Sequence, residues 1–108
     1  DVMNRIAAWC EGEPGMDFIE GDPPRVSFEG EDLTLEGNEF RIVITHRTEG
    51  GDRAVAQSML SGTPMARVAS EGDTVVITHP VYTDGLTTHA FMEAVYAVGR
   101  AAQAMAEA

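Results

Sequence analysis

Apolar residues recur with two different periods along this chain, and the periods divide it into helices and strands. A spacing of three or four residues marks one face of a helix, whereas alternation of apolar and polar residues marks a strand with one wet face. The helical spacing is found at residues 2–10, 53–60 and 88–108. The alternating or β-branched segments are 25–29, 33–35, 40–46, 65–69 and 74–78.

The C-terminal stretch has the clearest pattern, a β-branched strand followed by a long helix. Thr87 has the hydroxyl of a typical N-cap residue, since it can accept a free amide of the first turn. Phe91, Val95 and Val98 then fall on one face. We expect this face to cover a sheet that the other segments form.

Short turns that contain Gly join the strands, which predicts an antiparallel arrangement. Residues 11–24 are rich in Gly and Pro, and their apolar positions fit either a flap or a short edge strand. The residues from His79 to Tyr82 are expected to leave the sheet, because Pro80 cannot donate a ladder hydrogen bond. The prediction is one α+β domain over residues 1–108, in the order α-β-β-β-α-β-β-α with a five-stranded antiparallel sheet.

The charge balance excludes some classes of partner. The chain has 108 residues with 18 acidic and 7 basic side chains, which gives a net charge of -11, and all the basic residues are Arg. A surface this negative repels phosphate backbones and anionic membranes, so we expect neither nucleic acid nor a membrane as a partner. The excess acid either keeps the protein soluble or receives a basic or polar segment of a partner.

Cysteine use and hydropathy favour a cytoplasmic protein. Cys10 is the only cysteine, so no disulfide can form within the chain, which fits a reducing compartment. Beside Trp9 on the first helix, Cys10 is interpreted as a small buried hydrophobe rather than a nucleophile. No apolar run has the length that a membrane span needs.

No catalytic motif is present, so the sequence predicts a protein that is not an enzyme and has no cofactor. One alternative is a metal- or small-molecule-binding protein. The similar strands that end in His46 and His79 could bring these two imidazoles together, with Asp84 or His89 as a third ligand.

The last helix carries a second stripe beside its main apolar face, formed by Met92, Tyr96 and Gly99. A helix that is apolar over much of its girth is either deeply buried or in contact with another subunit. We therefore expect these residues to contact a partner or a second copy in a homodimer.

The C-terminal part resembles the YbjN-type family of bacterial sensory-regulator-like proteins, which share a type III secretion chaperone-like fold. The resemblance is carried by Met65–Val68, then Glu71–Val76 with its Gly-Asp turn, then Thr83–Thr87 at the helix entry. It implies an acidic, dimeric protein that holds extended partner segments. The hypothesis is therefore a chaperone-like or regulatory module that docks a partner segment on its sheet edge or in a helix-flanked groove.

Overall fold

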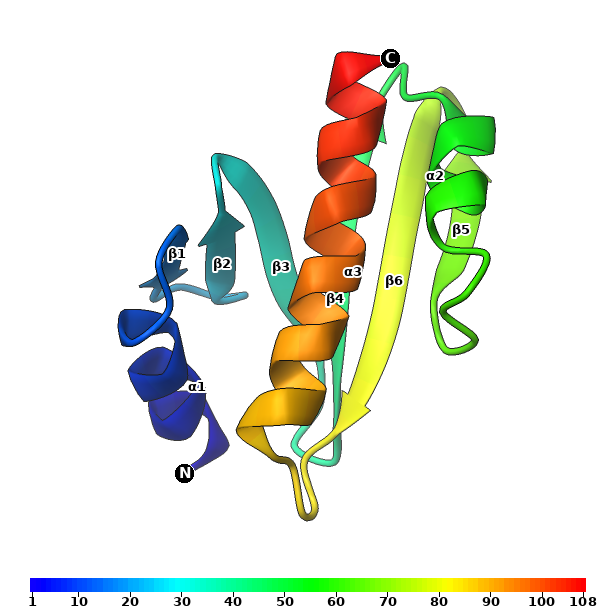
Figure 1. Ribbon diagram of the computed structural model, residues 1–108. Helices are drawn as coiled ribbons and strands as arrows, with labels where there is room; N and C mark the ends of the chain where they lie inside the picture. Colours follow the sequence, from blue (N-terminus) through cyan, green and yellow to red (C-terminus); the bar gives the residue numbers. More distant parts are fainter.

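The computed structural model describes residues 1–108 and contains three helices and one six-stranded sheet (Figure 1). The elements in chain order are α1 (Val2–Glu11), β1 (Met16–Ile19), β2 (Arg25–Phe28), β3 (Glu31–Gly37), β4 (Arg41–Glu49), α2 (Arg53–Met59), β5 (Arg67–Glu71), β6 (Thr74–Tyr82) and α3 (Thr88–Glu107).

The sheet has the order β1-β2-β3-β4-β6-β5, and every neighbouring pair is antiparallel. The α+β class and the antiparallel arrangement are as predicted, but the count of five strands was wrong. The sixth strand is β1, in which Met16 and Phe18 pair with Phe28 and Val26. Met16 is buried, and this burial of alternate side chains explains why a short segment in a turn-rich region forms an edge strand.

The prediction that the chain leaves the sheet at His79 was also wrong, because β6 continues to Tyr82. Pro80 lies opposite Val43, whereas the backbone N–H of Thr83 donates to the carbonyl of Phe40 at 3.1 Å. Hydrogen-bonded and non-hydrogen-bonded pairs alternate in an antiparallel ladder, so Pro80 occupies a non-hydrogen-bonded position toward β4. On its other side β5 does not reach Pro80, since its first residue, Arg67, pairs with Thr78. The missing N–H of Pro80 therefore breaks no ladder hydrogen bond.

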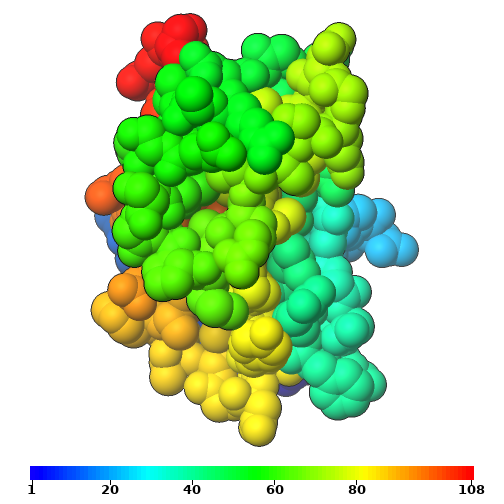
Figure 2. Space-filling view, turned by 90° about the vertical axis from the view of Figure 1, so that its right-hand side faces the viewer, coloured from blue at the N-terminus to red at the C-terminus, as the bar shows by residue number.

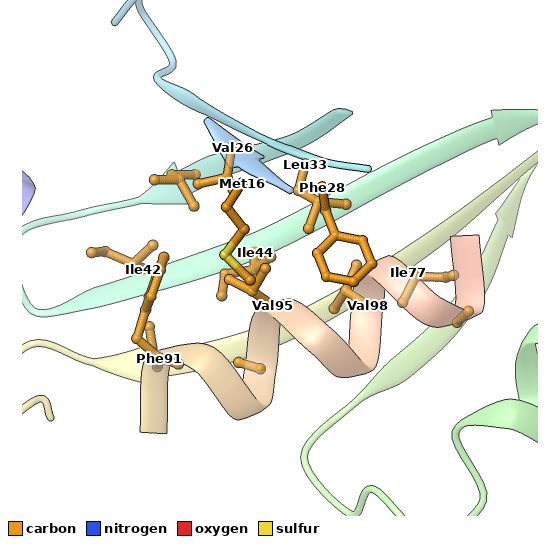
Figure 3. Close-up of a cluster of buried hydrophobic side chains, with 14 of the residues drawn as sticks. Met16, Val26, Phe28, Leu33, Ile42, Ile44, Ile77, Phe91, Val95 and Val98 are labelled. Carbon is orange, nitrogen blue, oxygen red and sulfur yellow. The ribbon is translucent and has the colours of Figure 1, made fainter. Parts of the chain in front are cut away.

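Helix α3 covers one face of the sheet, as predicted, and supplies much of the core. The hydroxyl of Thr87 accepts from the backbone N–H of Ala90 and caps the helix. Phe91, Val95 and Val98 are fully buried. They point toward apolar side chains of the central strands (Figure 3), among them Ile42, Ile44 and Ile77.

Strand β3 forms a step in the sheet. Its first half, Glu31–Thr34, pairs with β2, and its second half, Thr34–Gly37, pairs with β4. Where β3 and β4 are no longer paired, the buried imidazole of His46 bonds through Nδ1 to the carbonyl of Asp32 at 2.8 Å. On the side of β2, the other half of the step leaves β3 unpaired at Glu36 and Gly37, beyond the hydrogen bond that Leu35 donates to Pro24.

Candidate functional site

A cleft of about 840 Å³ lies at this step, between the start of α1, the chain before β2, and the second half of β3. We call it the β3 cleft. Its apolar and proline lining comes from residues far apart in the sequence, namely Val2, Met3, Pro23, Pro24, Leu35 and Ile42. The cleft therefore exists only in the folded chain.

The floor of the β3 cleft is an unpaired strand edge. The backbone N–H of Leu35 donates to the carbonyl of Pro24 at 2.8 Å, which is the last contact across this edge before the chain turns away at Pro23. Bonding directions alternate along a strand, so the N–H of Gly37 points to the same side as that of Leu35. A free donor on an open edge can pair with the backbone of another extended chain.

The far end of the cleft is fixed by the turn between β3 and β4. The Asn38 side chain accepts from the backbone N–H groups of Phe40 and Arg41 at 2.9 and 3.0 Å. Gly37 has a φ of 103°, and a Cβ at this position would collide with the carbonyl of Arg41. Only glycine fits there, so the shape of the cleft depends on it.

A bidentate ion pair borders the cleft on the face of the sheet that no helix covers. Arg47 donates from Nη1 and Nη2 to the two carboxylate oxygens of Glu36 at 2.6 and 3.2 Å. The hydroxyl of Thr34 also donates to Glu36. The Arg47 hydrogen bonds lower the pKa of Glu36, with a further contribution from Thr34, and the same contact raises the pKa of Arg47. Glu36 is therefore ionised and held in place.

The balance of charge in the cleft is negative. Asp22, Glu36 and Glu39 line it, and Arg47 is the one basic residue that does so. Since Arg47 is engaged by Glu36, the carboxylates of Asp22 and Glu39 remain without a basic partner. An apolar cleft with unneutralised carboxylates at its rim favours a ligand that carries positive charge.

The three residues that the sequence assigned to partner contact lie on α3, in different surroundings. Gly99 is buried within the chain, where the ring of Phe28 packs against it. Tyr96 packs edge-on against Phe28 with ring centroids 5.1 Å apart, and its hydroxyl donates to Glu13 at 2.8 Å. This hydrogen bond is the main cause of the raised pKa of Tyr96. Met92 and Tyr96 remain half-buried and accessible to a partner.

The alternative metal site is not formed. His46 lies opposite Ile77 and His79 lies opposite Ile44, so the two strands run antiparallel and offset the histidines. Both ring nitrogens of His46 are engaged, since Nε2 lies 2.7 Å from the hydroxyl of Thr48. No group of three His, Cys, Asp or Glu side chains, Asp84 included, is arranged to hold a metal ion.

Signals for the β3 cleft in the sequence are weak. The Pro23-Pro24 pair indicated a break in the chain, but nothing near it showed that the break would face Leu35. Glu36 has no local pattern that marks it as part of a site, because its ion pair with Arg47 depends on the pairing of β3 with β4.

None of the three helices has the length and apolar content that crossing a bilayer requires.

Comparison by sequence alone identifies no family: no protein-family profile and no curated protein matches the chain. Comparison of structures finds similar folds. An uncharacterized protein from Methanothermobacter thermautotrophicus superposes with a TM-score of 0.68 at 15% identity, over 97% of this chain and 94% of that chain. YbjN from E. coli, for which a role as a transcription regulator has been suggested, superposes with a TM-score of 0.61 at 14% identity, over 97% of this chain and 89% of that chain.

These two likenesses show that the chain has a YbjN-like α+β fold, as the sequence resemblance implied. At such low identity a shared fold does not carry a shared function. Neither similar protein is described as a secretion chaperone, so that part of the resemblance stays a prediction.

Proposed function

From the YbjN-like fold and the acidic cleft on an open strand edge, we propose that this protein is a non-enzymatic binding module. It takes an extended, basic segment of a partner protein into the β3 cleft, where the segment pairs with the open edge at Glu36 and Gly37, beyond the hydrogen bond between Leu35 and Pro24. The observation that carries this proposal is the step in β3, which leaves a strand edge unpaired inside a cleft.

The backbone of the segment supplies the general affinity of this interaction. An extended chain that joins a sheet edge forms main-chain hydrogen bonds whatever its side chains are, and alternate side chains enter pockets that give specificity. Here the pocket-facing side chains meet Val2 and Met3 on α1, and Ile42 on β4. Small or β-branched apolar residues at alternate positions suit such a lining.

The charged rim selects the remaining positions. Asp22 and Glu39 are acidic without a basic partner, so Arg or Lys side chains that project from the segment are attracted to them. Because these are rim charges, we expect the affinity to fall as salt screens them.

A role in transcription, as suggested for YbjN, fits this proposal only if this chain contacts other proteins rather than DNA. A net charge of -11 opposes direct binding to the phosphates of DNA. If this chain acts in regulation, it does so by holding a basic segment of another protein. We place it in the cytoplasm, where its single thiol, Cys10, needs no disulfide partner.

A homodimer through α3 is a separate part of the proposal. Met92 and Tyr96 offer a half-buried apolar surface on α3, whereas Gly99, buried against Phe28 of the same chain, supports this surface from within. Light scattering at micromolar concentration tests this association: the dimer predicts twice the monomer mass, and a monomer at every concentration contradicts it.

The docking proposal is tested by titrating the isotope-labelled protein with a short capped peptide in which Arg alternates with Val. We expect saturable shifts of the amide signals of Leu35, Gly37 and Met3. The matched control peptide has Glu in place of each Arg and should not bind.

Two charge-reversal variants locate the site. Glu39→Arg replaces an unpaired rim carboxylate by a cation and should weaken binding of the basic peptide about tenfold, which corresponds to about 1.4 kcal/mol. Glu107→Arg makes the same change of net charge at the far end of α3 and should have little effect. Equal losses in the two variants, or shifts spread over all acidic surfaces, would show non-specific attraction and reject the proposal.

A further inference from the structure

A second depression, of about 340 Å³, lies on the open face of the sheet, across β4, β6 and β5. We call it the open-face depression. It is lined by Arg41, Val43, Met65, Arg67, Pro80 and Tyr82, and by Thr78, which lies opposite Arg67 in the ladder. Figure 2 shows this part of the surface, where the chain between α2 and β5 lies near the end of β6 and the turn between β3 and β4.

The depression follows from the pairing of the strands. Val43 and Pro80 lie directly opposite each other, and both have short side chains. On one side of them Arg41 is paired with Tyr82, and on the other Thr78 is paired with Arg67. Short side chains between long ones leave a hollow with an apolar floor.

The charge of this hollow differs from that of the protein as a whole. None of its lining residues is acidic, in a chain with 18 acidic side chains. The three ion pairs of the protein use Arg25, Arg47 and His89, so neither arginine of the depression is neutralised. Two unpaired guanidinium groups at one apolar hollow form an attractive site for carboxylates on a surface that otherwise repels them.

One of these arginines is held in position. Nη1 of Arg67 donates to the carbonyls of Pro64 and Ala66 at 2.8 and 2.9 Å, so two carbonyls anchor one nitrogen of the fork. The Nη2 and Nε donors remain available for a ligand. A guanidinium anchored in this way loses less freedom when a carboxylate binds to its free donors.

Apolar groups beside the arginines are unusually exposed. Tyr82 is 55% exposed and Met65 is 45% exposed, and both border the depression. An exposed aromatic ring and an adaptable thioether are typical of surfaces that receive an aromatic or aliphatic side chain.

We propose that the open-face depression binds an acidic segment of a protein partner, in which a carboxylate residue stands next to an aromatic one. The carboxylates pair with Arg41 and Arg67, and the aromatic ring packs on Val43 and Pro80 beside Tyr82. This site has the opposite charge preference to the β3 cleft and does not depend on it.

The test uses a capped tripeptide, Glu-Phe-Glu amide, and the uncharged control Gln-Phe-Gln amide, each titrated into the labelled protein. The acidic peptide should shift the amide signals of Val43, Thr78 and Tyr82, and the control should bind at least tenfold more weakly. The double variant Arg41→Gln/Arg67→Gln should lose this difference. The matched double variant Arg5→Gln/Arg100→Gln changes the net charge equally, away from the depression, and should keep it.

Equal binding of the two tripeptides, shifts located elsewhere, or unchanged binding by the Arg41→Gln/Arg67→Gln variant would overturn the proposal. Binding of free benzoate at the same signals with an affinity equal to that of the acidic tripeptide would also reject a peptide segment as the occupant. Each of these results leaves the β3 cleft proposal standing, because that site is probed with a basic peptide and a different set of signals.

Discussion

Replacing Gly99 by alanine should destabilise the protein, although the same change in most helices stabilises it. Gly99 lies in the middle of α3, where alanine has the higher helix propensity by about 0.8–1 kcal/mol. An added Cβ, however, would lie only 2.6 Å from Cγ and 2.8 Å from Cε1 of Phe28. Phe28 is buried and packs against Tyr96, so its ring has little room to move.

The net effect is worked out from these two terms. Overpacking of a well-packed core costs about 1–3 kcal/mol. Subtracting the gain in helix propensity leaves a loss of about 1 kcal/mol in the free energy of unfolding, or a fall of about 4–8 °C in melting temperature. The loss should be independent of protein concentration, because the contact between Gly99 and Phe28 lies within one chain.

Urea unfolding followed by circular dichroism measures this effect. Gly62→Ala is the matched control, since Gly62 is exposed and a Cβ there would touch nothing within 4 Å. Phe28→Leu removes the ring edge that faces α3, and in that background Gly99→Ala should cost less. If Gly99→Ala raised the stability by the full propensity gain, the close packing of α3 on β2 would be wrong.

Three further predictions concern the step, the cleft and α1. His46→Leu leaves the carbonyl of Asp32 and the hydroxyl of Thr48 without their hydrogen-bond partner. It should lower the free energy of unfolding, measured in urea, by about 2 kcal/mol. Unchanged stability would mean that the imidazole does not hold the step together. The pKa of Glu36 is lowered in the folded state, so the stability that its ion pair contributes is present above pH 4.5 and is lost as the pH falls through the lower folded pKa. The difference in unfolding free energy between the wild type and Glu36→Gln should therefore close in acid. A difference that widens in acid would contradict the ion pair with Arg47. Burial, with a smaller effect of Asp17, raises the pKa of the Cys10 thiol to about 11. Alkylation of Cys10 by iodoacetamide in mildly alkaline buffer should therefore be slow in the native protein and fast in urea. Rapid labelling of the native protein would show that α1 opens.

Local patterns predicted the elements of this fold well, because their causes are local. The capping hydroxyl of Thr87 and the apolar face of Phe91, Val95 and Val98 determine the start and the orientation of α3 from neighbouring residues alone. The limits of β6 were missed because they depend on β5. Pro80 is tolerated only because β5 begins at Arg67, opposite Thr78, and does not reach Pro80, a fact that no pattern around Pro80 contains.

The candidate sites were harder to predict than the elements, since both arise from pairing across the sheet. The β3 cleft requires Pro24 to face Leu35, and the open-face depression requires Arg41 and Arg67 to flank the same proline from two different strands. Gly99 is a further example of a contact that local patterns do not show. Its place on a second stripe of α3 suggested an outer contact, yet Phe28, far away in the sequence, packs against it.

The central claim is that a partner segment pairs with the open edge of β3, and hydrogen exchange at the amide of Gly37 tests it most directly. In the free protein this N–H points into the cleft, so the basic peptide should slow its exchange with solvent as it pairs with the open edge at Glu36 and Gly37. If the peptide binds at saturation while the amide of Gly37 exchanges as fast as before, no strand has been added at this edge and the claim is contradicted.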